Sequence, residues 1–188
     1  FTSQISNTQP APLLTGGIRK SYDDANELRK NNVKDFSANT EPALKGFSVN
    51  PSVFETTASE FLAQPDLSDE IFGPTTLLIR SQNREDLLAI ARSLEGQLTA
   101  SIHGSDEDLA EYTDLIAILE TKVGRLIFNG FSTGVEVCPS MVHGGPYPAT
   151  SDSRSTAVGS RAITRFARLV CYQNFPDTAL PDELREAN

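Results

Sequence analysis

The amino-acid sequence predicts an α/β fold in which a parallel sheet is flanked by helices, in three layers. Three short apolar runs, at 75–80, 98–103 and 125–129, have the composition of strands that are covered on both faces. Amphipathic helical patterns over 83–95 and 105–119 lie between them. This alternation of strands and helices with short links favours parallel strands with right-handed connections.

The composition is typical of a soluble globular protein. The 188 residues suit one domain, and 38% are hydrophobic and 22% charged. The formal net charge is -9 and the pI is near 4.7. Nucleic acids and anionic membranes bind clustered basic side chains, but the Lys and Arg residues of this chain are scattered among more numerous acids. No apolar run approaches the roughly 18 residues that span a bilayer. We therefore expect no nucleic-acid partner and no membrane association.

The cysteines and the start of the chain bear on its cellular context. Cys138 and Cys171 are too few for a disulfide framework in a chain of this size, so we expect both to be reduced, in a cytoplasmic protein. The chain starts at Phe1, and its single methionine is Met141. Either a leading segment has been removed or the chain is a piece of a longer protein. Because no targeting signal is visible, we expect the second.

Helix and strand patterns also precede the alternating region. Residues 1–14 are typical of an irregular lead-in. A helix is predicted from Gly16 to Asn31–Asn32, with an inner face formed by Ile18, Tyr22, Ala25 and Leu28. Two short strand segments are expected between Leu44 and Thr57, around Asn50-Pro51, before a helical turn over 59–64.

Capping signals and a long loop define the second half. Gly96 and Gly124 stand where the two helical units would stop, and Ser105 precedes acidic residues that suit a first helical turn. Residues 130–155 form the longest region without a helix or strand pattern, which predicts a functional loop. A helix over 157–167, a last strand over 168–175 and a helical segment over 181–187 are expected to follow.

The segment "DEIFGPTTLLIR" places an acid and an aromatic residue directly before a strand. The Glu70 carboxylate can accept two hydrogen bonds from a vicinal diol such as that of a ribose, and Phe72 offers a flat apolar surface. Gly73-Pro74 would hold the turn that aims both side chains. Alternatively, Glu70 is a solvated surface acid and Phe72 plugs the end of the sheet, and the pattern alone favours this second interpretation.

The long loop leaves the carboxyl end of the strand at 125–129, where open parallel sheets bind ligands. Cys138 and His143 both lie on it, but no third group is placed to orient the imidazole, and Cys138 suits a packed side chain better than a nucleophile. His143 could contact a ligand or cap a turn, and His103 is more typical of a structural residue. Two histidines without clustered cysteines predict no metal site, and no dinucleotide fingerprint is present.

These motifs resemble the aldehyde dehydrogenase family. The sequences are "EIFGP" at 70–74, "GFSTGVEV" at 130–137 and "HGGPYPATSDSR" at 143–154. The closest similarity is to the C-terminal part of the catalytic domain in the α-ketoglutaric semialdehyde (2,5-dioxovalerate) dehydrogenase branch. The resemblance extends from about "PLLTGGIRKSYDDA" to the C-terminus. It implies the α/β architecture of that catalytic domain, with a C-terminal strand for an oligomerisation sheet.

The resemblance also implies an activity and roles for individual residues. It implies oxidation of a carboxylate-bearing semialdehyde to an acid through a cysteine thioester, with NAD or NADP as cofactor and NADP favoured. Glu70 would bind the nicotinamide ribose and Phe72 would pack beside the nicotinamide ring. Val135, Cys138 and His143 would line the aldehyde pocket, although most relatives have phenylalanine where this chain has His143.

No catalytic residue is implied within this chain. In the family, the nucleophilic cysteine and the general-base glutamate lie upstream of the matched part, and neither Cys138 nor Cys171 aligns with the nucleophile. We therefore expect residues 1–167 to be the C-terminal part of a catalytic domain and residues 168–188 an oligomerisation strand and tail. The expected partners are an aldehyde, the missing N-terminal part of the same chain and further copies of the protein.

A rival interpretation is a free-standing α/β ligand-binding or assembly module. Its ligand would bind at the long loop, and its last strand would form an interface. The enzyme interpretation further predicts that the chain is inactive in isolation.

Overall fold

The computed structural model describes residues 5, 8–31, 33–37 and 46–186. The chain divides into two units, which are described in turn. Unit 1 comprises Phe1–Glu95 and Ser105–Leu119, and unit 2 comprises Gly96–Gly104 and Glu120–Asn188. The parts of the predicted lead-in, first helix end, strand pair and last helix at 1–4, 6–7, 32, 44–45 and 187 lie outside the described residues.

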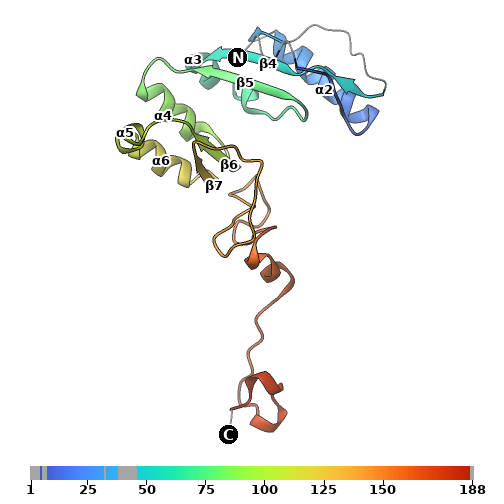
Figure 1. The fold of residues 1–188 in the computed structure, drawn as a ribbon, viewed down its shortest axis with the longest axis vertical. Coiled ribbons are helices and arrows are strands. Elements are labelled where there is room, and N and C mark those ends of the chain that lie inside the picture. Colours follow the sequence, from blue (N-terminus) through green and yellow to red (C-terminus); the bar gives the residue numbers. More distant parts are fainter. Residues whose placement is uncertain (1–4, 6–7, 32, 38–45, 187–188) are drawn as a thin grey trace. The chain divides into compact units, whose positions relative to one another are not determined.

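Unit 1 is built on a three-stranded sheet in the order β2-β4-β5 (Figure 1). The long strands β4 and β5 are parallel, and Phe54 is in register with Leu77. The short β2 is antiparallel to β4, and β1 pairs with β3 in a separate two-stranded ladder. The strands are β1 Ala11–Pro12, β2 Lys34–Asp35, β3 Ser48–Val49, β4 Ser52–Thr57 and β5 Thr75–Arg80.

Side-chain caps begin several of the described helices, close to where the sequence predicts a helix to start. Thr15 caps α2, and Asn83 caps α4. Ser105 caps α5 in a capping box with Asp108, which satisfies two backbone groups at once. The helices are α2 Gly16–Lys30, α3 Ala58–Ala63, α4 Arg84–Ser93, α5 Asp106–Glu111 and α6 Thr113–Glu120, with a 3-10 turn η1 at Pro65–Ser68.

The core of unit 1 lies around β4. Phe54 is fully buried at 0% exposure, and Val53 beside it is almost so. A cluster of Ala58, Phe61, Leu67 and Ile90 joins α3 and η1 to α4. Apolar burial of this kind stabilises the unit by about 25 cal/mol per Å².

Unit 2 contains the parallel pair β6 Gln97–Ile102 and β7 Val123–Phe128. A long loop follows β7 and contains no helix or strand until η2, a 3-10 helix at Ser160–Phe166. Two further 3-10 turns, η3 Asp177–Ala179 and η4 Asp182–Leu184, lie near the C-terminus. No described helix, in either unit, is both long enough and apolar enough to cross a bilayer.

The expected helix over 105–119 is two helices, α5 and α6, separated at Tyr112. Two side chains replace the helical hydrogen bond at the break. Arg84 Nη2 donates to the Glu111 carbonyl over 2.9 Å, and the backbone N–H of Leu115 donates to Asp114 Oδ1 over 2.9 Å. An unbroken helix would have joined that carbonyl to that N–H.

Other expectations at the helix and strand ends were wrong. Gly124 does not stop a helical unit, because it lies inside β7. The helix expected over 157–167 is the 3-10 helix η2. Residues 168–175 form no strand, since a strand needs a ladder and no described segment pairs with them. The two-residue strands β1 and β2 were not predicted.

Candidate functional site

Unit 1 contains an open hollow beside the "EIFGP" segment. Its volume is about 600 Å³. One side is the exposed end of the segment, and the other is the first turns of α2. The lining residues are Thr15, Gly17, Ile18, Ser21, Tyr22, Ala25, Glu70, Ile71 and Phe72.

Glu70 and Phe72 both present their side chains to the surface at this hollow. Phe72 is 68% exposed, so it does not plug the end of the sheet within this chain. Among the described residues, the Glu70 carboxylate has no hydrogen-bond or ion-pair partner. An acid acceptor and an aromatic ring are therefore available together at one edge of the hollow.

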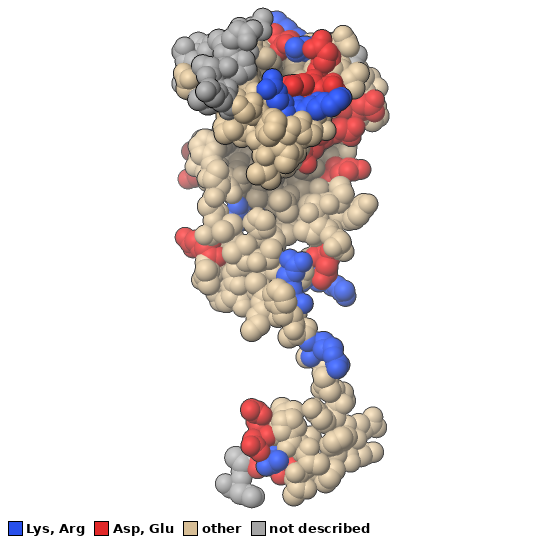
Figure 2. All heavy atoms as spheres, turned by 90° about the vertical axis from the view of Figure 1, so that its right-hand side faces the viewer, with Lys and Arg blue, Asp and Glu red and all other residues tan. Residues whose placement is uncertain are grey.

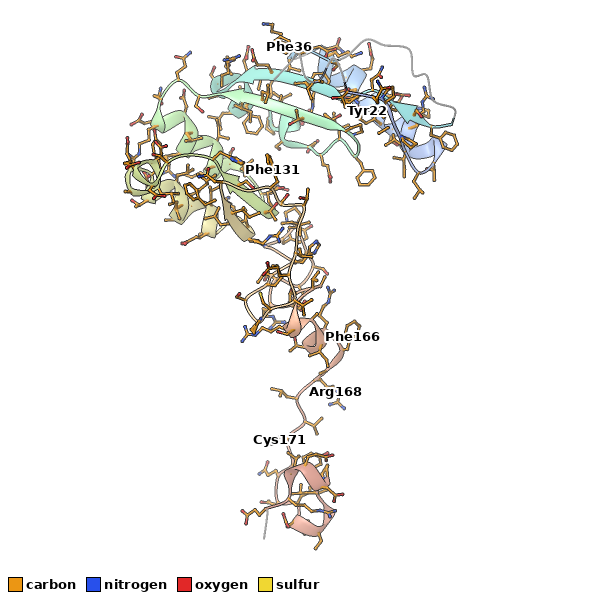
Figure 3. The ribbon with its side chains drawn as sticks, viewed as in Figure 1. Tyr22, Phe36, Phe131, Phe166, Arg168 and Cys171 are labelled. Carbon is orange, nitrogen blue, oxygen red and sulfur yellow. The ribbon has the colours of Figure 1, made fainter. Side chains whose placement is uncertain are left out.

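The Tyr22 side chain packs against the Gly73-Pro74 turn (Tyr22 is labelled in Figure 3). The tyrosine is 3% exposed, and its hydroxyl lies 2.8 Å from the Asn50 carbonyl, 2.9 Å from Ser52 Oγ and 3.3 Å from the Pro74 carbonyl. Gly73 has a φ of +152°, and a Cβ at this position would lie 2.4 Å from Tyr22 Cδ2. Only glycine allows the turn to pack this closely on the ring.

Asn26 and Arg29 continue this contact along α2. Asn26 Nδ2 donates to the Tyr22 carbonyl, and its Oδ1 accepts from Thr75 Oγ1 over 3.3 Å. Arg29 Nη2 donates to the Asp69 carbonyl over 2.8 Å. Burial lowers the pKa of Arg29, and the nearby Asp69 charge opposes that shift. The segment is thus bound to α2 directly before Glu70 and directly after Gly73.

Asn26 and Arg29 were not predicted from the sequence. Leu28 was expected on the inner face of the helix, but it is 69% exposed and Arg29 is buried. Apolar periodicity selects the wrong neighbour here because the buried groups are polar and bonded to backbone carbonyls. The available signal was the spacing of Tyr22, Asn26 and Arg29, which lie on one face of a helix.

In unit 2, the predicted pocket residues lie along one loop. Val135 is exposed, Cys138 is half-buried and His143 is exposed. Cys138 Sγ lies 3.4 Å from Ser140 Oγ, and no described hydrogen bond joins it to His143. The backbone N–H of His143 donates to Thr156 Oγ1 over 2.8 Å. A thiolate-imidazole pair is therefore absent from the described chain.

Arg125, which was not predicted as a site residue from the sequence, binds the first half of this loop. Its guanidinium donates from Nη1 to the Gly134 carbonyl over 2.6 Å and from Nη2 to the Ser132 carbonyl over 2.8 Å. Nη1 also lies 3.6 Å from Met141 Sδ. One strand side chain thus holds the backbone on either side of Thr133, next to Val135.

The loop was expected at the carboxyl edge of the sheet. In the structure it reaches both ends of β6 and β7. At the carboxyl edge, the Phe131 ring lies 5.3 Å from that of His103 (Phe131 is labelled in Figure 3). Gly144 and Gly145 lie at the opposite edge. A Cβ on Gly145 would lie 2.3 Å from the carbonyl of Gln97, the first residue of β6. Backbone packs on backbone here, which only glycine permits.

Comparisons with known proteins identify the family. Residues 6–152 match the family model described as "Aldehyde dehydrogenase family". The chain is 43% identical over 180 residues to alpha-ketoglutaric semialdehyde dehydrogenase 2 of Azospirillum brasilense, covering 94% of this chain and 34% of that protein. It is 42% identical over 193 residues to alpha-ketoglutaric semialdehyde dehydrogenase of Acinetobacter baylyi, covering 100% of this chain and 36% of that protein.

A solved structure agrees at the level of the fold. Aldehyde dehydrogenase C of Pseudomonas syringae, a C291A mutant in complex with NAD+ and octanal, superposes with a TM-score of 0.52 at 22% identity. The match covers 65% of this chain and 25% of that protein. The chain thus spans about a third of the length of the curated relatives that it matches. On the family match and these identities, the chain belongs to the aldehyde dehydrogenase family.

Proposed function

We propose that this chain is the C-terminal part of the catalytic domain of an NAD(P)-dependent aldehyde dehydrogenase that oxidises a carboxylate-bearing semialdehyde. The observation that carries the proposal is 43% identity along 94% of the chain to a semialdehyde dehydrogenase. The exposed Glu70 and Phe72 beside an open hollow agree with it. Under this proposal, the nucleophilic cysteine and the general base belong to the polypeptide upstream.

Glu70 and Phe72 are the residues of this chain that would hold the nicotinamide half of the cofactor. The Glu70 carboxylate, which has no partner among the described residues, can accept hydrogen bonds from both ribose hydroxyls, and the exposed ring can pack beside the nicotinamide. Bound NAD(P)+ would supply the hydride acceptor. NADP is the favoured form by resemblance to the family.

Val135, Cys138 and His143 would contribute to the aldehyde pocket. Val135 offers an apolar contact, Cys138 a small polarizable one and His143 a hydrogen-bonding group. Arg125 holds the loop that carries them through bonds to the carbonyls of Ser132 and Gly134. Its role would be to limit the freedom of the pocket wall and so to preserve the position of the substrate.

The full-length protein that carries this chain tests the proposal. It should form NAD(P)H when given 2,5-dioxovalerate, with a kcat/KM at least about tenfold above that for an unbranched aldehyde of equal length without the carboxylate. Measuring kcat/KM with NAD+ and with NADP+ tests the cofactor preference. If neither aldehyde yields NAD(P)H, the enzyme proposal fails and a ligand-binding module becomes the better interpretation.

A further inference from the structure

Three buried side chains on one face of α2 bond to the segment that carries Glu70 and Phe72. Tyr22, Asn26 and Arg29 are each 9% exposed or less. Their spacing, i, i+4 and i+7, places them in one row along the helix. We call this row the α2 clamp. Burying polar groups is unfavourable unless they are bonded, so the bonds that they make account for their position.

The Tyr22 hydroxyl also contacts Asn50 and Ser52 outside the segment, but the bonds from the α2 clamp to the segment itself fall at its two ends and leave its middle free. Arg29 binds the Asp69 carbonyl, directly before Glu70. Tyr22 supports the turn after Phe72, because its ring lies against Gly73 and its hydroxyl lies 3.3 Å from the Pro74 carbonyl.

Asn26 contributes to the same end of the segment. Its side-chain N–H group donates to the Tyr22 carbonyl over 2.9 Å, which fixes the direction of the amide. Its Oδ1 then accepts from Thr75 Oγ1 at the start of β5. All three side chains thus act on the segment, and none of these bonds reaches Glu70 or Phe72 themselves.

We propose that Tyr22, Asn26 and Arg29 are positioning residues for cofactor binding: they hold the backbone of residues 69–75 so that Glu70 and Phe72 stand over the hollow. This inference rests on the proposed function of Glu70 and Phe72. A ligand-binding acid on an unrestrained segment would have to be ordered on binding, and the α2 clamp removes that cost in advance.

The test uses the full-length protein with NAD+ and NADP+ as probes. Arg29→Met removes the donors and keeps a long apolar side chain, whereas Arg29→Lys keeps one donor group and the charge. Arg29→Met should raise the KM for the cofactor and lower the rate of hydride transfer by roughly 10- to 100-fold, since misplacement of about 1 Å has effects of this size. The KM for the aldehyde should change little, and Arg29→Lys should restore part of the loss.

Tyr22→Phe provides a second test if Arg29→Met fails to fold. It keeps the ring against Gly73 and removes only the hydroxyl, so the cofactor KM should rise by a smaller factor. Lys20→Met is the matched control, because Lys20 lies on the exposed face of the same helix and pairs with Asp24. The control should leave both KM values unchanged.

A double-mutant cycle separates this inference from the proposed function. If the α2 clamp acts through Glu70, Arg29→Met should have little further effect in a Glu70→Gln background. Equal effects of Arg29→Met in both backgrounds, or an unchanged cofactor KM in folded Arg29→Met and Tyr22→Phe, would overturn the positioning role. An unchanged cofactor KM in Glu70→Gln alone would instead overturn the proposed function of Glu70.

Discussion

Glu70 lies on a backbone segment that hydrogen bonds from α2 hold in place. Its carboxylate has no partner among the described residues, while the carbonyls of Asp69 before it and Pro74 after it are bonded to α2. An unpaired carboxylate on a fixed backbone keeps its full capacity to accept hydrogen bonds from a ligand. This distinguishes Glu70 from the acids of α2, several of which are paired with basic neighbours, such as Asp23 with Arg19.

We therefore predict that Glu70→Gln in the full-length protein lowers the rate of hydride transfer by about tenfold. A hydrogen bond to a charged acceptor is roughly twice as strong as one to a neutral amide, and about 1.4 kcal/mol corresponds to a factor of ten. Single-turnover formation of NAD(P)H measures the rate. Glu95→Gln, a neutral substitution at an exposed position away from the hollow, is the control. Identical traces for the two variants would exclude the assigned role.

The motif residues of the site could be predicted from the sequence, but the residues that support them could not. The local pattern of "EIFGP" favoured a solvated acid and a packed ring, and the resemblance to a family motif is what pointed to Glu70 and Phe72 as candidate site residues. Arg29 bonds to a carbonyl 40 residues away, and Arg125 bonds to carbonyls of a loop without regular pattern. Bonds from a side chain to a distant backbone leave no periodic trace in a sequence, so these residues emerge only once the chain is folded.

At the scale of elements, α4 and α6 are linked by an ion pair. Arg84 Nη2 lies 2.7 Å from Asp114 Oδ1, and Arg84 Nε lies 3.3 Å from Asp114 Oδ2. The hydrogen bond from Arg84 lowers the pKa of Asp114 below its ordinary value of 3.8. A carboxyl with a lowered pKa in the folded state contributes stability above its unfolded pKa, and that stability is lost as the pH falls through the folded value.

We predict that Asp114→Asn lowers the unfolding temperature at neutral pH and that the difference from the natural protein narrows below about pH 4. The narrowing follows because protonation removes the same ion pair from the natural protein. Thermal unfolding across this pH range measures the difference. Asp106→Asn removes an equal charge from an exposed position on α5. A difference for Asp114→Asn that stays constant with pH would contradict the assignment.

Packing of the loop on β7 gives a second prediction at this scale. A Cβ on Gly124 would lie 1.9 Å from the Gly144 carbonyl oxygen and 3.1 Å from Gly145 Cα. Gly124→Ala should therefore lower the free energy of unfolding by about 2 kcal/mol, as expected for overpacking against backbone that cannot move aside. Gly134→Ala on the same loop meets no atom within 4 Å and should change it by less than about 0.5 kcal/mol. Urea unfolding measures both, and equal losses would refute the close contact.

The elements were predictable to the extent that local rules decide them. Helices α2 and α4 and strands β4 to β7 follow apolar periodicity and capping residues, and they appear within a few positions of their predicted bounds. The break at Tyr112 was not predictable from local pattern, because the carbonyl that it frees accepts a hydrogen bond from Arg84, 27 residues away in the sequence. Gly124 has the appearance of a helix stop in the sequence, yet its role is to admit the Gly144 carbonyl.

At the scale of the whole molecule, charge and apolar surface are distributed differently along the chain. Acidic and basic side chains intermingle in the upper part of Figure 2. The segment at 160–175 exposes large apolar groups. Three of its residues, Phe166, Arg168 and Cys171, are labelled in Figure 3 to show where it lies. Between residues 160 and 175, the exposed large apolar residues are Ile163, Phe166, Leu169, Val170, Tyr172 and Phe175. Contiguous apolar surface is typical of sites of protein contact.

These exposed groups support the proposal that residues 168–188 join an oligomer of the full-length protein. Residues 168–175 contain the β-branched and aromatic residues of a strand but have no strand partner among the described residues. A ladder supplied by another copy would satisfy their backbone groups and cover their apolar side chains. The strand predicted from the sequence and the unpaired segment in the structure are consistent if the partner is a second subunit.

We predict that Leu169→Glu lowers the oligomeric state of the full-length protein. Leu169 is 100% exposed here, so a glutamate costs the isolated chain little, whereas it would place a charge in an apolar interface. Sedimentation velocity at several concentrations measures the mass of the particle. Asn174→Asp adds the same charge at an exposed polar position on the other face of the expected strand, and should leave the mass unchanged at concentrations where Leu169→Glu has dissociated. If Leu169→Glu sediments like the natural protein at every concentration, this segment does not form the interface.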